Sequence, residues 1–425
     1  MSTSLQQGIT AFKEQIDAPI ASFFNSCVRC GMCAEACLFY LETGDPKYTP
    51  IYKLEPLRRV WKQEYTFLGR LLAGLGISRK LTDADLAEWQ ELLYDSCTLC
   101  GRCSLICPVG NDITYMIRKA REGMVAAGYA PQGLKGATYR AVTIGSPMGI
   151  KLPAFKRKIE IAEQETGLSI PLDHSGAEYL LVMSSAEIIE FPEFIGAMAR
   201  IFDQANVSWT FASDAFEATN SGIQIGSSDL AATLVQRIVD AAERLQVKYV
   251  ISPECGHAYT ALRWEGPNLI GRPYRFKVIH VLELLNQLHR EGRLKLEGKD
   301  REKLTFHDPC QIVRRGGVLE EPRELLNLVA DDLVEMPCAG KWNWCCGGGG
   351  GVSANPDADE LRLKVFNIKK TQLDATGAKK LVTSCSNCRN MLDDGIEEYG
   401  MDVEVIGLAE MLADHLAQTE TTQED

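Results

Sequence analysis

The stretch CTLCGRCSLICP, residues 97–108, contains four cysteines in the order C-x2-C-x2-C-x3-C, followed by a proline. An earlier stretch, CVRCGMCAEAC at residues 27–37, has the same spacing without the proline. Three cysteines at two-residue intervals in a tight loop can surround one face of a compact metal cluster, and the fourth can reach a neighbouring one. The two runs therefore predict a module that folds around metal.

The composition of the chain favours this interpretation. Fifteen cysteines in 425 residues favour metal or redox chemistry over disulfides, because the start of the chain shows no secretory signal and the cytosol keeps thiols reduced. No apolar run is long enough to span a bilayer, so we expect a cytoplasmic protein that meets a membrane only through a partner. A net charge of -12 disfavours nucleic acid as a partner.

The spacing predicts two [4Fe-4S] cubane clusters, because in two-cluster ferredoxins the fourth cysteine of each run binds the other cluster. One cluster is expected on Cys27, Cys30, Cys33 and Cys107, and the other on Cys97, Cys100, Cys103 and Cys37. Zinc is the alternative, but zinc sites usually show two separated C-x2-C pairs. Helical patterns at residues 81–95, capped by Thr82 or Asp83, and at residues 113–128 predict a helical ferredoxin module.

Beyond about residue 145, short apolar segments alternate with helical patterns, which predicts α/β units with a mostly parallel sheet. Strands are expected at 179–186, 207–213, 248–252, 303–307, 333–337 and 380–384, and a helix at 228–246. KYVIS leading into PECGHA resembles KLVTS leading into CSNCRN, so two copies of one half-domain are predicted. In this alignment Pro253 and Gly256 replace the cysteines of CSNC, and Cys255 is displaced by one position.

The predicted fold class is α+β and multidomain, with a ferredoxin module followed by two pseudo-repeated α/β half-domains. The expected divisions are an N-terminal extension at 1–25, the helical two-cluster ferredoxin domain at 26–145, a degenerate half-domain at 146–300, a complete half-domain at 301–417 and a disordered tail at 418–425. Only the second half-domain carries a complete cysteine motif.

That motif includes KWNWCCGGGGG, residues 341–351, in which two adjacent cysteines precede five glycines. We expect Gly347, Gly348 and Gly349 to approach a cluster closely and to offer it backbone N–H groups. A flexible loop is the alternative interpretation. A phosphate loop would need G-x4-G-K-[ST], whereas Val352 and Ser353 follow the glycines.

The order Cys310, Cys345-Cys346-Gly347 and Cys385-x2-Cys388 resembles the cysteine-rich CCG domain of heterodisulfide reductases. With a two-cluster ferredoxin on the same chain, the arrangement resembles the D-type subunit of those enzymes and related subunits of sulfite-reductase-associated and sulfur-oxidising complexes. The resemblance implies one further [4Fe-4S] cluster, noncubane in the archaeal enzyme. Its implied ligands are Cys310, Cys345, Cys346, Cys385 and Cys388, which Cys255 or Cys338 can supplement or replace.

The resemblance also implies an oxidoreductase of sulfur metabolism, a subunit that relays electrons through the cubanes to or from the CCG cluster. There a disulfide would be reduced or a dithiol oxidised, with the five motif cysteines as catalytic residues. His257 and His307 are candidate proton donors, the alternative being histidines that bond loop backbone. The implied partners are a flavoprotein or a membrane b-type cytochrome, and a small disulfide or a carrier protein with a dithiol or lipoyl group.

Two other functions stay open at this point. One is the iron–sulfur subunit of a flavin-dependent glycolate, lactate or glycerol 3-phosphate dehydrogenase, in which the chemistry occurs on a partner's flavin. The other is an electron-transfer scaffold without a substrate site of its own. The chain shows no flavin or nicotinamide fingerprint, so any such cofactor is expected on a partner.

Overall fold

The computed structural model describes residues 2–417, and the disordered tail expected at 418–425 lies outside these residues. The chain folds into two compact units whose segments alternate along the sequence. Unit 1 comprises the residues up to Tyr139 together with Ser221–Ala231 and Trp344–Lys369. Unit 2 comprises Arg140–Asn220, Ala232–Asn343 and the residues from Lys370 onward. The α+β multidomain class predicted from the sequence is confirmed.

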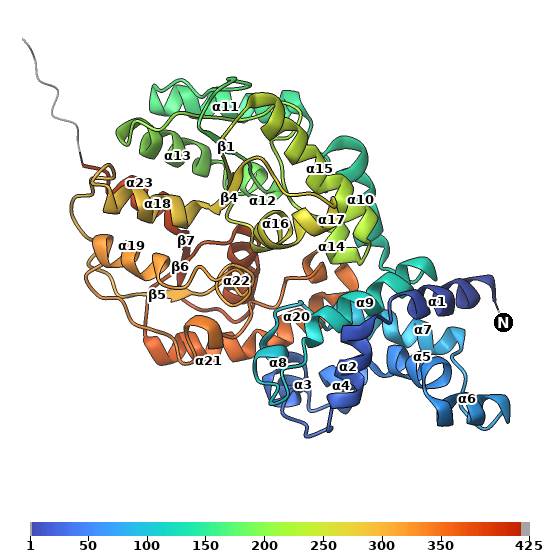
Figure 1. Ribbon diagram of the computed structural model, residues 1–425. Helices are drawn as coiled ribbons and strands as arrows, with labels where there is room; N and C mark the ends of the chain where they lie inside the picture. The colour runs from blue at the N-terminus through green and yellow to red at the C-terminus, as the bar shows by residue number, and fades with distance from the viewer. Residues whose placement is uncertain (1, 418–425) are drawn as a thin grey trace, which may run out of the picture. The chain divides into compact units, whose positions relative to one another are not determined.

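In its described residues unit 1 is built from helices (Figure 1). They are α1 (Thr3–Glu14), α2 (Ala18–Ser26), α3 (Leu38–Thr43), α4 (Pro50–Lys53), α5 (Glu55–Tyr65), α6 (Phe67–Gly74), α7 (Asp83–Gln90), α8 (Arg102–Leu105), α9 (Ile113–Ala126), α14 (Ser221–Ile225) and α20 (Asp359–Val365). Helix α1 packs along α9 and also contacts α5. The cysteine runs lie between these helices, and the second run includes α8.

Helix α7 shows how the sequence sets a helix start. Thr82 accepts a hydrogen bond from the Asp85 backbone N–H at 3.2 Å, and the Asp85 carboxylate accepts one from the Thr82 N–H at 2.9 Å. This reciprocal capping box satisfies two N–H groups that the first helical turn leaves without partners. The predicted helix at 81–95 therefore begins after Thr82, and it ends in a π-helical turn, Glu91–Asp95, just before the second cysteine run.

Unit 2 contains two small parallel sheets. The first has the strand order β2-β1-β3-β4, with β1 (Tyr179–Leu181), β2 (Trp209–Thr210), β3 (Tyr249–Ser252) and β4 (Lys277–His280). The second has the order β5-β6-β7, with β5 (Leu304–His307), β6 (Lys380–Thr383) and β7 (Glu404–Gly407). The central strands β3 and β6 are buried at nearly every residue, as parallel strands covered on both faces must be.

Helices alternate with these strands along the chain (Figure 1). They are α11 (Leu152–Thr166), α12 (Ser185–Ile189), α13 (Glu193–Gln204), α16 (Gly256–Tyr259), α17 (Gly266–Leu269), α18 (Val281–Arg290), α19 (Glu321–Val329), α22 (Ser386–Glu398) and α23 (Leu408–Asp414). Three further helices, α10 (Gln132–Ile144), α15 (Ser228–Leu245) and α21 (Asn367–Thr376), carry the chain from one unit into the other. Within residues 2–417, no helix has both the length and the hydrophobicity that crossing a membrane requires.

The internal repeat is visible in the strand register, and it corrects the sequence alignment. Strand β3 pairs with β4 so that Ser252 lies opposite His280, while β6 pairs with β7 so that Thr383 lies opposite Gly407. Two loop residues follow Ser252 and one follows Thr383, so Cys255 and Cys385 each occupy the N-cap of the next helix. Their backbones are alike, with φ near -135° and -144°. Cys255, which was expected to be displaced, is therefore the structural counterpart of Cys385.

Three expected strands are shorter than the apolar patterns suggested. At 333–337 only Leu333 forms an isolated bridge, to Leu304, because Pro337 lacks the N–H group that a ladder needs. In the segment 179–186 the regular strand ends at Leu181, and Met183 adds only an isolated bridge to Glu217, because Ser184 then caps α12 in a capping box with Glu187. The segment 207–213 retains two strand residues.

Candidate metal centres

The two cysteine runs of unit 1 follow the same backbone path. In the first run, Arg29 and Gly31 have φ values of 54° and 84°; at the same positions of the second run, Leu99 and Gly101 have 56° and 78°. A positive φ is unfavourable for arginine and leucine, so its recurrence at equivalent positions indicates a required turn. The left-handed turns bend each loop, and the cysteines line the cavity on its concave side.

The first group of cysteines surrounds one cavity. Cys27, Cys30, Cys33 and Cys107 all line it, the last coming from the other run. Burial raises the pKa of the Cys33 thiol to about 11, and the neighbouring Cys27, Cys107 and Cys30 thiolates contribute to that rise. Cys30 is exposed, so this group lies at the surface of unit 1.

The second group surrounds a separate cavity and is more buried. Cys37 lines it together with Cys97, Cys100 and Cys103. Burial, followed by the proximity of Cys100, Cys97 and Cys37, raises the pKa of Cys103 well above its ordinary value. Thiols that raise one another's pKa in this way repel as thiolates, and a bound metal relieves that repulsion. Both groups therefore fit a [4Fe-4S] cluster, and their assignment as its ligands remains a prediction.

A buried lysine accompanies the second group, and no sequence pattern indicated it. Lys53 is only 2% exposed, and its Nζ lies 4.0 Å from the Cys37 Sγ and donates a hydrogen bond to the Ser96 carbonyl. Burial raises the pKa of Cys37, and the Lys53 ammonium opposes that rise. A cation at this place offsets the negative charge of thiolate ligands.

Arg121 is a second buried cation that sequence reasoning missed. Its side chain is fully buried, and its guanidinium donates hydrogen bonds to four backbone carbonyls. The acceptors are Leu93 O at 3.0 Å, Cys97 O at 2.8 Å, Gly350 O at 2.6 Å and Gln224 O. These acceptors are neutral, and among residues 2–417 no carboxylate forms an ion pair with Arg121. A buried cation without an anionic partner is costly, so an anionic cluster beside Cys97 would supply the missing counter-charge.

The adjacent cysteines of the CCG motif belong to unit 1, beside the second cysteine run. Cys345 and Cys346 are both buried. The Cys345 Sγ lies 3.4 Å from the Thr98 hydroxyl, and Thr98 directly follows Cys97. The cysteine pair is thus held against the loop of the second cysteine group, a proximity that 247 residues of sequence separation concealed.

Side chains around the pair strengthen this contact. The Arg102 guanidinium stacks over the Trp344 ring, 3.4 Å from its centroid. Asn355 donates a hydrogen bond to the Asp95 carboxylate at 2.5 Å. Trp344 thus lies under an arginine of the second run, and its stacking joins the two segments.

Gly350 offers a sharp test of this packing. Its φ is 64°, and a Cβ at this position would lie 2.8 Å from the Thr98 carbonyl carbon and 3.0 Å from the Cys97 oxygen. Gly350→Ala should therefore lower the midpoint of thermal unfolding and weaken the spectroscopic signal of the second cluster. We expect a loss of stability of about 1–3 kcal/mol beyond the backbone cost of a left-handed alanine.

Gly377→Ala is the matched control, because Gly377 has a φ of 63° and no atom within 4 Å of the place that a Cβ would take. The control incurs only the backbone cost, about 1–2 kcal/mol. Equal shifts for the two variants would show that close packing of the glycine run on the second loop is not important for stability.

The other motif cysteines lie in unit 2. Cys310 follows β5, Cys385 is the N-cap of α22 and Cys388 lies in its first turn, and all three are buried. A hydrogen bond from Cys388 lowers the pKa of Cys385 to about 7, assisted by the Gly256 backbone N–H and opposed by burial. A thiol with a lowered pKa is a ready metal ligand because the thiolate is the binding form.

The two cysteines named as supplementary ligands differ in their surroundings. Cys255 is buried, and burial followed by the proximity of Cys385 raises its pKa. Cys338 is exposed, in a left-handed turn with φ 62° after Pro337. The structure therefore brings Cys255 to the motif cysteines of unit 2, whereas Cys338 lies at the surface.

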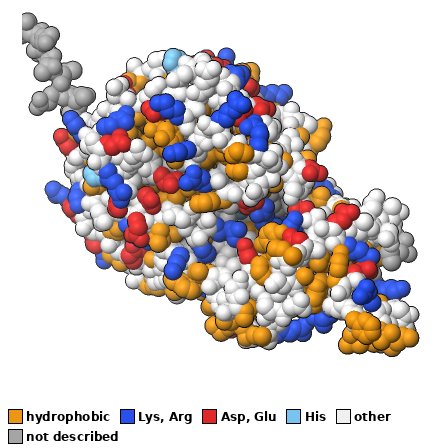
Figure 2. All heavy atoms as spheres, viewed as in Figure 1, with side chains coloured by type: hydrophobic (Ala, Val, Ile, Leu, Met, Phe, Trp, Pro, Cys, Tyr) orange, Lys and Arg blue, Asp and Glu red, His pale blue; other side chains and the backbone are white. Residues whose placement is uncertain are grey.

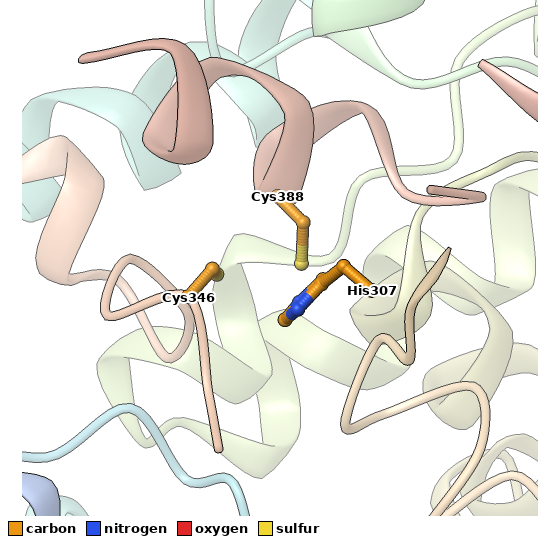
Figure 3. A group of neighbouring side chains, drawn as sticks. All are labelled: His307, Cys346 and Cys388. Atoms are coloured by element: carbon orange, nitrogen blue, oxygen red, sulfur yellow. The ribbon is translucent and has the colours of Figure 1, made fainter. Parts of the chain in front are cut away.

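Both candidate histidines are buried in unit 2. His307 ends β5, and one of its ring nitrogens lies within 4.8 Å of the Cys388 Sγ. Figure 3 shows the Cys388 thiol and the His307 ring pointing toward one another. His257 lies in the short helix α16, two residues after Cys255. His307 is thus placed beside a motif cysteine.

Two buried glutamates, Glu187 and Glu254, and the half-buried Glu410 were not anticipated near Cys255 and Cys385. The Glu254 N–H donates to the Glu187 carboxylate at 2.6 Å, and the Ser386 N–H donates to the Glu254 carbonyl at 2.7 Å. Burial raises the pKa of Glu254, and the nearby Glu410 and Glu187 carboxylates raise it further. These bonds join the loop of the first half-domain to α22 of the second, a pairing that arises only when the repeats fold together.

Comparisons with known proteins identify two domains in the chain. Residues 24–111 match the 4Fe-4S dicluster domain, and residues 304–393 match the cysteine-rich CCG domain. The class is thus that of iron–sulfur proteins that combine these two domains on one chain, with several [4Fe-4S] clusters.

Relatives that match most of the chain give a more specific similarity. An Hdr-like menaquinol oxidoreductase iron–sulfur subunit of Archaeoglobus profundus is 27% identical, over 97% of this chain and 83% of the relative. The D-type subunit of a dihydromethanophenazine:CoB–CoM heterodisulfide reductase from Methanosarcina acetivorans is 26% identical, over 92% and 94%. An EtfAB:quinone oxidoreductase of Syntrophomonas wolfei is 28% identical, over 91% of this chain and 57% of its own length. The similarity to the D-type subunit of heterodisulfide reductases and its relatives, expected from the cysteine motifs, is confirmed.

The first two of these relatives are named as subunits of oxidoreductases, and the third is named as a quinone oxidoreductase. Together with the two domains, they indicate an iron–sulfur subunit that transfers electrons within an oxidoreductase.

Proposed function

We propose that this chain is the iron–sulfur subunit of a heterodisulfide-reductase-like complex in sulfur metabolism. Electrons would pass through two cubane clusters to or from a third cluster at the CCG motif, where a disulfide is reduced or a dithiol oxidised. The proposed ligands are those named from the sequence: the two groups of four cysteines, and Cys310, Cys345, Cys346, Cys385 and Cys388 for the third cluster.

One observation supports this most directly. The cysteine pair lies within unit 1 on the loop of the second group, with Cys345 Sγ 3.4 Å from Thr98. A cluster bound by Cys345 and Cys346 would adjoin the cluster bound by Cys97 and its partners. An adjacent acceptor is what an electron relay needs.

The reaction balances as one disulfide plus two electrons and two protons giving two thiols. When bound, the clusters supply one-electron transfer and an iron site for sulfur. The cysteines would bind the iron, Lys53 and Arg121 would offset the negative charge of the thiolate ligands, and burial of the motif cysteines would exclude water. His307, beside Cys388, and His257 are the proposed proton donors.

The exposed first group marks where electrons would enter or leave. Cys30 is exposed, and its neighbours Val28 and Met32 are apolar and exposed as well. A cluster at this surface would lie close to the redox group of a docked partner, which favours electron exchange with a flavoprotein or a b-type cytochrome. A small dithiol or lipoyl carrier would instead bind at the CCG centre.

The experiment starts from protein purified without oxygen and chemically reduced. Mixing it with a heterodisulfide or with lipoamide should reoxidise the clusters and release two thiols per two electrons. Optical and paramagnetic spectra measure the reoxidation of the clusters. Cluster reoxidation without thiol release would contradict the disulfide substrate while leaving electron transfer intact.

A second candidate function is electron transfer between a flavoprotein and a further acceptor, without sulfur chemistry. The similarity to the EtfAB:quinone oxidoreductase favours it. In that case a co-purifying flavoprotein should reduce the clusters from a 2-hydroxy acid or another flavin substrate, and disulfides should leave the reduced clusters unchanged.

A further inference from the structure

Unit 1 carries an exposed apolar surface outside its cysteine runs, here called the α6 patch. It consists of five side chains that are each between 50% and 79% exposed: Phe67, Leu68, Leu71, Leu75 and Ile77. Helix α6 has no buried residue, although most of its residues are apolar. In Figure 2 the hydrophobic side chains gather at the lower right, where Figure 1 places α6.

The charge around the α6 patch differs from that of the chain. Residues 66–80, TFLGRLLAGLGISRK, contain the cations Arg70, Arg79 and Lys80 and no acidic residue, in a chain with a net charge of -12. Arg70 and Lys80 are exposed and form no ion pair with any residue in 2–417, while Arg79 pairs with Asp85 at 2.8 Å. The segment is therefore apolar and cationic together.

A helix with this composition fits the boundary of a lipid bilayer. Leucine and phenylalanine side chains enter the acyl region of an interfacial helix, while arginine and lysine contact the headgroups. Each cation near an anionic surface strengthens binding. An acidic protein surface would match the charges alone, but the apolar side chains would remain exposed to water. We propose that the α6 patch docks this chain onto the surface of an anionic lipid bilayer.

Docking here would also orient the electron-transfer module. Helix α5 contacts α6, and Arg58, Trp61 and Lys62 of α5 line the cavity of the first cysteine group. Lipid contact through α6 would hold this group, which includes the exposed Cys30, near the membrane. The docking is independent of the proposed sulfur chemistry, because none of the patch residues belongs to a cysteine site.

Vesicle flotation of the full-length protein, prepared without oxygen, tests the proposal. The protein should float with vesicles of phosphatidylcholine and phosphatidylglycerol, float poorly with phosphatidylcholine alone, and dissociate as salt rises. Phe67→Ser combined with Leu71→Ser should abolish flotation. Arg70→Glu should weaken it by about tenfold or more. Because these side chains are exposed, cluster spectra should match those of the unmodified protein.

Met148→Ser is the control, because Met148 is a half-exposed apolar residue of unit 2, and it should float normally. Failure of the unmodified protein to float with anionic vesicles would overturn the proposal. Sedimentation gives a second test. If the unmodified protein self-associates and the Phe67→Ser/Leu71→Ser variant is a monomer, a second copy of the chain covers the patch, and the proposal is overturned. Equal flotation of the variants would show that another surface binds lipid, which also overturns it.

Discussion

Cys345→Ser or Cys346→Ser should remove the proposed third cluster and leave the two cubane clusters of the ferredoxin module in place. Both side chains are buried, and the Cys345 Sγ lies against Thr98, so serine keeps the shape of the side chain and removes the proposed iron ligand. Mutation of a residue that only hydrogen-bonds to a metal ligand typically lowers metal affinity or activity by about 10–100-fold. Loss of a ligand itself should therefore lower disulfide turnover by more than about a hundredfold. Iron content, paramagnetic spectra and thiol release measure the effect.

Cys338→Ser is the matched control, because this cysteine is exposed. It should retain all clusters and full turnover. Intact cubane signals in the Cys345 and Cys346 variants would show that unit 1 still folds, and turnover can then be interpreted. A Cys346→Ser variant that keeps the third cluster's signal and turns over disulfides normally would refute the proposed centre.

Arg121→Met should lower the reduction potential of the cluster at Cys97 and destabilise unit 1. A buried cation stabilises the additional negative charge of a reduced cluster, so its removal makes reduction harder. The variant also leaves four buried carbonyls without their donor, at a cost of about 1–3 kcal/mol for each that finds no substitute. A redox titration followed by paramagnetic spectroscopy gives the potential, and thermal unfolding gives the stability.

Arg121→Lys separates the two effects. Lysine keeps the charge and cannot reach four carbonyls, so the potential should stay close to that of the unmodified protein while the unfolding midpoint falls. The potential of the first cluster should change little in either variant. Arg157→Met, at an exposed site, serves as the control for loss of one positive charge. An unchanged potential in Arg121→Met would show that this cation does not act on the cluster.

Local patterns explain why much of the fold was predictable. The left-handed turns at Arg29 and Leu99 repeat because the C-x2-C-x2-C spacing repeats, and Thr82 begins α7 because a hydroxyl three residues before a carboxylate forms a capping box. Apolar strand patterns were less reliable: the segment at 333–337 pairs at one residue, because pairing depends on neighbours that a local pattern does not contain. A one-residue difference in loop length likewise hid the equivalence of Cys255 and Cys385.

By itself, the sequence determined the chemistry of this protein: thiols at metal-binding intervals, a glycine run beside a cysteine pair, and a repeated α/β half-domain. Spacing along the chain is enough for that, since a cluster loop is built from neighbouring residues. Only the tertiary structure decided what surrounds the thiols. It brought Cys345 to Thr98 and buried Lys53 and Arg121 beside the second group, and it left α6 uncovered. Contacts and burial between distant segments depend on packing in three dimensions, which no local pattern encodes.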